Sequence, residues 1–533
     1  MLWATTETRS LRKALKSTVS YFFAMTTGKS EKEQTDVSRR RFLKIGAGVV
    51  VVAAAGAAGY YYLTQPPSGP PTTTTTEATT GLPPTTLPPT TSAMAPENIE
   101  WGIWSWGVEL VNANAKIFNA NNPDVNLAVT DLGGAYTTAL YTRYQAGNPP
   151  DIHYSTPDVS YFLQYKKWLA DIEDIAPQAT KYLDDMYPGV RQFHINPFTK
   201  KLHGLCYWLG PIVLAYNASH IKQAGFDAPP KTYDELAEQM LAIKKKGITD
   251  FPTGATWSWG FAYLWYNIMI GNVDPTTTAH YLFDENYNPI FNDKGTPFFD
   301  AVKWFLDRVY VDKTISPGIR EYDESGITTA LGSGTVSFAL AFADYDVAAA
   351  NASTMKQTGN IKIAMNPGTG YATFHAATYN ISKHCTDRGK SAQDAVWKAM
   401  EFAGGKTTNA KSDYDNGKFF VCKKLLDTYG VTSAYKAVNE DPTSIATMEK
   451  LGMNTDVLMQ QYQKLSSITY WDPAQTPWWG DWFSSPSSEA GGRVMPKFEA
   501  LMTKATKPSD NDILAFLNDI ANDWNTSKKA AGW

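Results

Sequence analysis

The chain has 533 residues, of which 43% are hydrophobic and 19% are charged, and its formal net charge is −4. This mildly acidic balance argues against a nucleic-acid partner, which would need a basic surface patch. The 7 histidines are dispersed without the paired spacing of a metal site, so we expect neither a metal nor another cofactor.

The N-terminal part of the chain carries an export pattern. The cationic run Ser38–Lys44 precedes an apolar Ala/Gly/Val-rich segment that ends near Leu63. That segment has about 19 residues, enough to cross a bilayer as a helix. We predict a cytoplasmic leader at residues 1–37 and a twin-arginine-like signal or membrane anchor at residues 38–63. The alternative is an ordinary charged flank of a membrane helix, and cleavage of the segment is left open.

A Thr/Pro-rich stretch separates this pattern from the body of the chain. Residues 64–98 cannot bury apolar surface and are predicted to form a stalk. The body, residues 99–533, would then lie at the cell surface, tethered to the cytoplasmic membrane. It is longer than one compact core usually grows, so two lobes are expected.

The start of the body alternates strand and helix patterns in the manner of an α/β protein. The predicted strands cover residues 99–106, 125–132 and 149–154, and the predicted helices cover residues 108–119, 136–144 and 159–168. This order implies a parallel sheet with right-handed crossovers, whose ligands lie at the carboxyl ends of the strands. The loops at residues 105–107, 133–135 and 155–157 should therefore point toward one cleft.

Further elements follow along the body. The predicted strands are an extended segment at 204–217 and buried strands at 336–342 and 361–365. Two helices are expected to begin with capping boxes, one at Thr232 with Glu235 and one at Ser391 with Asp394. From Asp510 onward the chain is predicted to form an amphipathic helix. Three cysteines are too few for a disulfide framework, although one pair, Cys385 with Cys422, could form.

The order of these segments resembles the sugar-type branch of the extracellular solute-binding proteins that feed ABC importers, which includes the maltose-binding proteins. The stretches that carry the resemblance are FNANNPDV at 118–125, YQAGNPPDI at 144–152, WLADIE at 168–173, the segment 201–217, and AGF at 224–226 with PPKTYDEL at 229–236. Weaker echoes lie at 332–338 and 379–383. The resemblance covers about residues 99–533, and its order and spacing, rather than any single motif, are specific. A Gly-Gly-Trp-type turn that is usual in the family is replaced here by residues 373–376.

The resemblance implies a type II periplasmic-binding-protein-like fold with two α/β lobes. Each lobe would be a mostly parallel sheet flanked by helices, with the ligand trapped between the lobes by hinge closure. The connecting strands would cross near residues 207–209 and 374–377. Lobe 1 would comprise about residues 99–207 and lobe 2 about residues 208–374, each with part of residues 378–533. Anchored binding proteins of thermophilic archaea resemble the layout further, with a similar anchor and stalk.

The same resemblance implies a function. The chain would capture a carbohydrate, above all an oligosaccharide, and deliver it to the permease subunits of an ABC importer. It would catalyse no reaction, bind no nucleic acid and act as a monomer.

The aromatic content, 17 Trp, 29 Tyr and 24 Phe, indicates how such a ligand would be held. Sugars present flat C–H faces ringed by hydroxyl groups, so their sites combine aromatic planes with planar polar groups. Most of the rings must be ordinary core, and Trp104 and Trp265 are assigned to it. The candidate ligand-binding residues are Trp106, Asp158, Trp208, Trp257, Trp259, Asp344, Tyr345, His375, Trp479, Asp481 and Trp482.

Two other functions remain open at this point. A secreted glycoside hydrolase would use a pair of positioned carboxylates, for which Asp344, Asp346, Asp472 and Asp481 are available. A surface carbohydrate-binding protein without a transport role, such as an adhesin or a sensor, is the other alternative.

Overall fold

The computed structural model describes residues 95–134, 136–257, 259–271, 282–284, 286–407, 418–465, 476, 478–482 and 493–533. Contacts divide the chain into two units, Met1–Thr91 and Ser92–Trp533. The predicted leader, signal or anchor and nearly all of the stalk lie outside the described residues and stay predictions. Across the described ranges, no helix combines the length and the apolar character needed to span a membrane.

A parallel unit forms one end of the sheet, as the alternating pattern predicted. β1 (Glu97–Ile103) pairs in parallel with β2 (Val125–Asp131) and with β3 (Ile152–Ser155). The helices that follow these strands are α3 (Val108–Asn121), α4 (Tyr136–Gln145) and α5 (Pro157–Tyr165). Alternate residues of β1 are apolar, so Ile99, Trp101 and Ile103 are buried against the helices.

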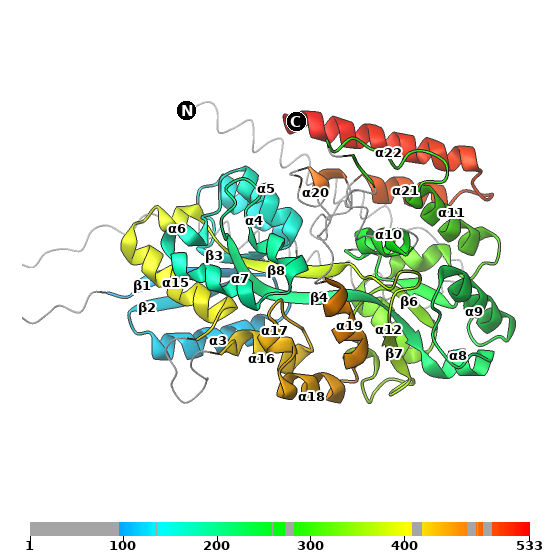
Figure 1. Ribbon diagram of the computed structural model, residues 1–533, viewed down its shortest axis with the longest axis horizontal. Helices are drawn as coiled ribbons and strands as arrows, with labels where there is room; N and C mark the ends of the chain where they lie inside the picture. The colour runs from blue at the N-terminus through cyan, green and yellow to red at the C-terminus, as the bar shows by residue number, and fades with distance from the viewer. Residues whose placement is uncertain are drawn as a thin grey trace, which may run out of the picture. The chain divides into compact units, whose positions relative to one another are not determined.

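Two long strands continue the sheet from this unit. β4 (Gly204–Asn217) and β8 (Phe374–Ile381) are antiparallel, and Gly210 lies opposite His375. These are the two segments predicted to cross between lobes. The strand order is β2-β1-β3-β8-β4-β6-β5, with β7 paired to β4. In Figure 1, β4 and β8 run from the β1–β3 end to the β6–β7 end.

The other end of the sheet is built on the second half of β4. β4 pairs in antiparallel fashion with β6 (Phe338–Ala343) and β7 (Ile361–Ala364), and β5 (Thr253–Ala255) pairs in parallel with β6. The two ends with their helices are the first lobe (β1–β3) and the second lobe (β5–β7). Because the long strands are antiparallel to their neighbours, the sheet is mixed, and its parallel pairs are confined to the two ends.

The remaining helices pack around the two lobes (Figure 1). On the first lobe, α15 (Lys390–Gly404) packs on β1, β4 and β8. Linked to it directly or in series are α6 (Ile172–Ile175), η1 (Pro177–Lys181), α7 (Tyr182–Asp185), η2 (Pro188–His194), α14 (Lys383–Thr386), α16 (Phe420–Tyr429), α17 (Lys436–Asn439), α18 (Pro442–Lys450) and α19 (Thr455–Leu465).

The second lobe is covered by another set. α10 (Phe261–Ile270) and α12 (Glu324–Ser333) pack on β6, and α13 (Asp346–Ala350) packs on β7. The others are α8 (Ala218–Ala224), α9 (Tyr233–Lys245), α11 (Pro297–Tyr310), η3 (Pro317–Glu321), α20 (Trp479–Trp482), α21 (Val494–Met502) and α22 (Asp510–Ala530). α22 is the helix predicted from Asp510, and it packs on α11 and α21.

The C-terminal end of α22 also reaches the first lobe. The Tyr165 hydroxyl, in the last turn of α5, donates a hydrogen bond of 2.6 Å to the backbone carbonyl of Ala531. This bond joins the lobes at a place remote in sequence from both crossing strands.

The predicted helix caps are found in part. The Thr232 hydroxyl accepts a hydrogen bond from the backbone N–H of Glu235, but the Glu235 carboxylate returns to the N–H of Lys231. The capping box at Ser391 was wrong: α15 begins at Lys390 after Gly389, which has φ 105°, and Asp394 bonds the Lys390 ammonium instead. Gly389 occupies the N-cap position with a positive φ that glycine adopts without steric cost, so the helix starts one residue before the predicted cap.

The Cys385–Cys422 disulfide that the sequence left open does not form, because Cys206, Cys385 and Cys422 are all free and buried. Cys422 lies near Cys206, and the Cys206 sulfur accepts a hydrogen bond from the backbone N–H of Ala434. Burial raises the pKa of the Cys206 thiol to about 11, so this thiol is unreactive at neutral pH.

Candidate functional site

Aromatic side chains meet where β4 and β8 cross. Trp208 of β4 lies 5.5 Å from Trp106 and 5.1 Å from His375, measured between ring centroids. Trp259 stacks on His375 at 4.8 Å with 23° between the ring planes. Tyr345 lies 6.2 Å from Trp106. We call Trp104, Trp106, Trp208, Trp259, Tyr345, His375 and Tyr429 the crossing cluster.

A bulge in β4 directs Trp208 into this cluster. Cys206 pairs with Thr378 while Trp208 pairs with Ala377, so Tyr207 is an extra residue on β4. A bulge interrupts the alternation of side chains between the two faces of a strand. As a result, the rings of the consecutive residues Tyr207 and Trp208 lie only 4.6 Å apart.

Each lobe supplies part of the crossing cluster. Trp106 lies between β1 and α3, in the first lobe. Trp259 precedes α10 and Tyr345 lies between β6 and α13, in the second lobe. Trp208 and His375 come from the crossing strands themselves. Trp208 and His375 are buried, whereas Trp106, Trp259 and Tyr345 are half-buried. Ring surface therefore stays accessible at the junction of the lobes.

The cluster includes a ring that sequence analysis assigned to the core. β1 ends at Ile103, so Trp104 lies just beyond the strand rather than inside it. Trp104 is half-buried and stacks on Trp208 at 4.9 Å. The predicted strand was three residues too long at this end, and that error hid the position of Trp104.

Carboxyl groups lie next to the rings. Glu324, the first residue of α12, accepts hydrogen bonds from the Tyr345 hydroxyl at 2.9 Å and from the Trp259 indole N–H at 3.1 Å. Asp346 shares a hydrogen bond with Glu324. Burial raises the pKa of Glu324, and burial together with the Glu324 charge raises the pKa of Asp346.

Asp344, the residue that follows β6, is close enough to Asp346 for their charges to interact. Its side chain is fully buried, and no side chain in the described ranges donates a hydrogen bond to it. Burial raises the pKa of the Asp344 carboxyl well above its ordinary value, and the backbone N–H of Tyr345 opposes the shift only in part. The site therefore holds acidic groups whose charges cost free energy when nothing neutralises them.

Sequence analysis missed Glu324 and Tyr429. Glu324 follows Asp323, whose side chain caps α12, so the local pattern is typical of a helix start and not of a binding site. Tyr429 is the last residue of α16 and lies 4.8 Å from Trp106. Nothing near either residue in the sequence points to the crossing strands, because the contact is made only by the fold.

Asp158 lies at the edge of the crossing cluster. It is the second residue of α5 and accepts a hydrogen bond of 2.6 Å from the Thr156 hydroxyl. Its charge, after burial, raises the pKa of Tyr263, and the Tyr263 ring contacts both Trp259 and His375. Asp158 thus faces the second lobe from the first.

Trp257 is not brought to the cluster. It is 2% exposed and packs against Phe261, Phe305 and Phe498 inside the second lobe. Its indole N–H donates a hydrogen bond of 2.7 Å to Glu499. The Gly and Ser neighbours of Trp257 indicated a loop, which is present, but the side chain turns into the core.

Trp479 and Trp482 belong to a separate aromatic group under α22. Trp482 lies 4.9 Å from Trp524 and 5.6 Å from Trp479, and Trp479 lies 5.8 Å from Tyr266. Both tryptophans are buried. Asp481 is in α20, and its side chain lies outside the described part of the structure. The ligand-binding role proposed for these three residues stays a prediction, and burial of both rings counts against it.

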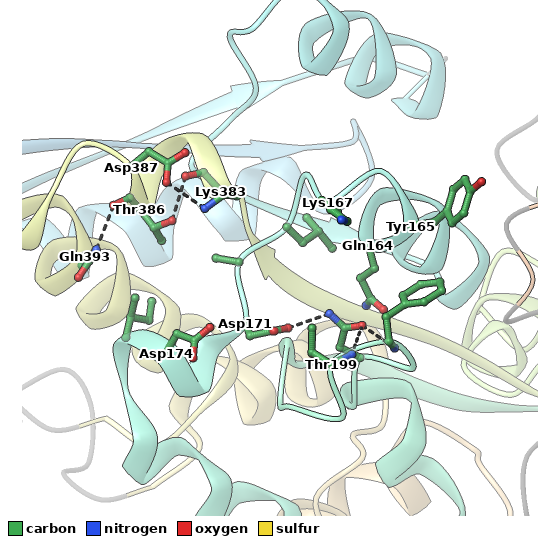
Figure 2. Close-up of a pocket in the computed structure, with 15 residues that line it drawn as sticks. Gln164, Tyr165, Lys167, Asp171, Asp174, Thr199, Lys383, Thr386, Asp387 and Gln393 are labelled. Carbon is green, nitrogen blue, oxygen red and sulfur yellow. Dashed lines mark hydrogen bonds and ion pairs between the residues drawn. The ribbon is translucent and has the colours of Figure 1, made fainter.

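A pocket lies elsewhere, on the first lobe. Its volume is about 630 Å³, and Gln164, Asp171, Asn196, Thr199 and Lys383 are among its lining residues. Figure 2 shows that its polar groups engage one another: Asn196 donates to Asp171 at 2.8 Å, and Lys383 pairs with Asp387 at 3.1 Å. None of the candidate ligand-binding residues lines this pocket, and its polar groups are largely satisfied internally.

Gly210 of the crossing strand β4 packs so closely against the Asp344 side chain that no larger residue fits at this position. A Cβ at residue 210 would lie 2.7 Å from the Asp344 Oδ1 atom. We expect Gly210→Ala to lower the free energy of unfolding by about 1–3 kcal/mol, measured by urea denaturation. Gly134→Ala is the matched control, because a Cβ there meets nothing within 4 Å. Equal stability of the two variants would contradict this packing.

Asp344 should make stability depend on pH. Because its pKa is raised in the folded state, the unfolded chain loses the proton first as pH rises, and stability falls through that range. Asp344→Asn should therefore raise the free energy of unfolding at pH 7 by about 1–3 kcal/mol. The gain should disappear below about pH 3, where the carboxyl is largely protonated in both states. Unfolding curves of the two proteins that differ equally at every pH would contradict this.

The architecture defines the class of protein. Two α/β lobes joined by long crossing strands, with an aromatic and acidic cluster at the crossing, constitute a two-lobe periplasmic-binding-protein-like fold. The family model described as bacterial extracellular solute-binding protein matches residues 105–410. The chain belongs to that family, and it is an extracellular solute-binding protein.

Solved structures share the fold at low sequence identity. Maltose-bound MalE3 of T. maritima has a TM-score of 0.60 at 16% identity, covering 80% of this chain and 99% of its own. The substrate-binding protein Lmo0181 of Listeria monocytogenes, in complex with cycloalternan, has a TM-score of 0.62 at 14% identity, with 81% and 99% covered. A solute-binding protein of Thermotoga lettingae bound to α-D-tagatose has a TM-score of 0.58 at 17% identity, with 80% and 99% covered. No curated protein sequence gives a significant match.

Proposed function

We propose that this chain is the receptor of an ABC importer for a carbohydrate, which it captures between its lobes and delivers to the membrane permease. The observation that carries the proposal is the crossing cluster, in which both lobes place half-buried aromatic rings beside carboxyl groups, around the buried Trp208 and His375 rings of the two crossing strands. Rings offer stacking planes for C–H faces, and carboxylates accept hydrogen bonds from hydroxyl groups. The maltose, cycloalternan and tagatose complexes of proteins with this fold support the same ligand class.

The N-terminal sequence pattern indicates where in the cell this receptor would act. An export signal or anchor at residues 38–63, followed by the stalk at residues 64–98, would hold a monomeric receptor at the outer face of the cytoplasmic membrane. A stalk of about 30 extended residues at roughly 3.1 Å each would span close to 90 Å, enough to reach a permease. Cell fractionation with and without residues 38–63 tests the tether.

We further propose that the chain catalyses no reaction. The Glu324 and Asp346 carboxyl groups share a hydrogen bond, so they are closer together than the roughly 5 Å that a retaining glycosidase needs between its two carboxyl groups. Release of reducing ends from any oligosaccharide would overturn this part of the proposal.

A calorimetric screen tests the receptor function. The full chain is titrated with neutral and amino oligosaccharides of defined linkage, and X-ray scattering follows the radius of gyration. We expect micromolar or tighter binding by at least one sugar, with a smaller radius on binding, because the ligand must favour the closed arrangement. No binding by any sugar, or binding without a change in radius, would contradict capture by lobe closure.

A further inference from the structure

The carboxyl groups of Glu324, Asp344 and Asp346, beside the crossing cluster, have no basic side chain among the described residues to pair with. The charges that act on Glu324 and Asp346 come from other carboxylates: Asp323 acts on Glu324, and both Glu324 and Asp344 act on Asp346. Within the described ranges, none of the ion pairs formed by lysine or arginine includes Glu324, Asp344 or Asp346. Buried charges in proteins are normally paired with an opposite charge.

An independent observation shows that polar atoms beside these groups lack a partner. In the described part of the chain, neither ring nitrogen of His375 has a hydrogen-bond partner, and no side chain donates a hydrogen bond to the Asp344 carboxylate. His375 is 5% exposed and Asp344 is fully buried. His375 stacks on Trp259, whose indole N–H is bonded to Glu324, so the unpartnered imidazole lies within the same network. Buried polar groups are normally paired, and a ligand that supplies hydrogen-bond donors would satisfy these.

The rings around the acids favour the same kind of ligand. Trp106, Trp259, Tyr345 and Tyr429 are half-buried. The faces of tryptophan and tyrosine rings attract cations through their quadrupoles, most strongly for tryptophan. Rings and carboxylates together attract a positively charged group. A neutral hydroxyl group can donate a hydrogen bond to a carboxylate but does not balance its charge.

We propose that the solute bound at the crossing cluster carries an ammonium group, as an amino sugar unit does, with Glu324, Asp344 and Asp346 as its counter-charges. The inference rests on the proposed carbohydrate-receptor function and specifies the class of sugar. An ammonium group has three N–H donors and can be shared among several carboxylates. His375, as an unprotonated imidazole, would accept from a neighbouring hydroxyl group.

A metal ion is the other way to neutralise such a group, and the geometry does not favour it. Across the described residues, no group of three histidine, cysteine or carboxylate side chains is arranged to hold a metal ion. An organic cation has no strict coordination geometry, and the aromatic faces add to its binding.

Matched sugars give the test. The full chain is titrated calorimetrically with three β-1,4-linked disaccharides that differ at C2: cellobiose, chitobiose and diacetylchitobiose. The corresponding α-1,4-linked glucose and glucosamine disaccharides form a second series. We expect the amine to bind at least about tenfold more tightly than its hydroxyl counterpart in one series, with the difference reduced at high salt. Equal affinities, or a preference for the neutral sugar, would overturn the inference and leave the receptor function standing. Binding of none of these sugars would overturn the inference, and the wider calorimetric screen decides the receptor function separately.

Isosteric variants locate the effect. Glu324→Gln and Asp346→Asn each remove one charge and should reduce the preference for the amine by about tenfold, with little change in the affinity for the neutral sugar. Glu321→Gln is the matched control, because Glu321 is an exposed carboxylate shortly before Glu324 in the chain. An unchanged preference in both variants would overturn the assignment. Titration with calcium chloride alone should give no heat, and saturable calcium binding that competes with the amine would show that the site is a metal site instead.

Discussion

Replacing Trp259 by alanine should weaken solute binding by about thirtyfold, which corresponds to roughly 2 kcal/mol. Trp259 is half-buried, stacks on His375 at 4.8 Å and donates its indole N–H to Glu324. Its removal takes away an aromatic ring on which a sugar could stack. It also leaves Glu324 with the Tyr345 hydroxyl as the only one of these two hydrogen-bond donors. Isothermal titration with the best-binding sugar gives the affinity, and a thermal melt shows whether the fold is retained.

The control for this variant lies two residues earlier. Trp257→Phe keeps a ring in the packed interior of the second lobe but removes the hydrogen bond to Glu499. It should lower the free energy of unfolding by about 1 kcal/mol and leave the affinity within twofold of the original. If Trp257→Phe and Trp259→Ala lose the same affinity, the crossing cluster is not the binding site.

Replacing Trp482 by alanine should have the largest effect on stability, lowering the free energy of unfolding by about 3–5 kcal/mol. Trp482 is fully buried, contacts Phe283, Phe291 and Trp524, and donates its indole N–H to the Ile520 carbonyl at 2.5 Å. Guanidinium denaturation measures the loss. Because this aromatic group is separate from the crossing cluster, the affinity of the folded variant should not change.

Trp533→Ala is the matched control for Trp482→Ala, because the Trp533 side chain is 51% exposed. It should change the free energy of unfolding by less than about 1 kcal/mol. The opposite pattern for Trp482→Ala, a large loss of affinity with unchanged stability, would show that Trp482 contacts the solute after all.

Periodicity predicted the strands and helices of the body well, because each depends on nearby residues. β1, β2, α3 and α4 begin and end within three residues of their predicted bounds. The crossing segments were predicted from the resemblance, and the structure pairs them as β4 and β8. Predictions that depend on one backbone angle are less secure. The sequence predicts a cap at Ser391, but α15 is preceded by Gly389, which has a positive φ and occupies the N-cap position.

The candidate site was predictable only where a residue lies on a crossing strand or in a loop next to the crossing. Trp106, Trp208 and His375 fall in that group, and they lie together. Glu324 and Tyr429 are separated from those residues by about 50 or more positions in sequence, and they meet them only through the packing of α12 and α16. Trp257 and Trp482 are both buried away from the crossing cluster. A Gly- or Pro-rich neighbourhood predicts a loop but does not reveal whether the ring faces solvent or core.

The hydrogen bond from Tyr165 to the Ala531 carbonyl has a mechanical consequence. A rotation of one lobe against the other about β4 and β8 must either carry the end of α22 along with α5 or break this bond. The end of α22 is thus a further connection between the lobes, besides β4 and β8. A peptide fused directly after Trp533 would lie next to this connection and could change how easily the lobes rotate.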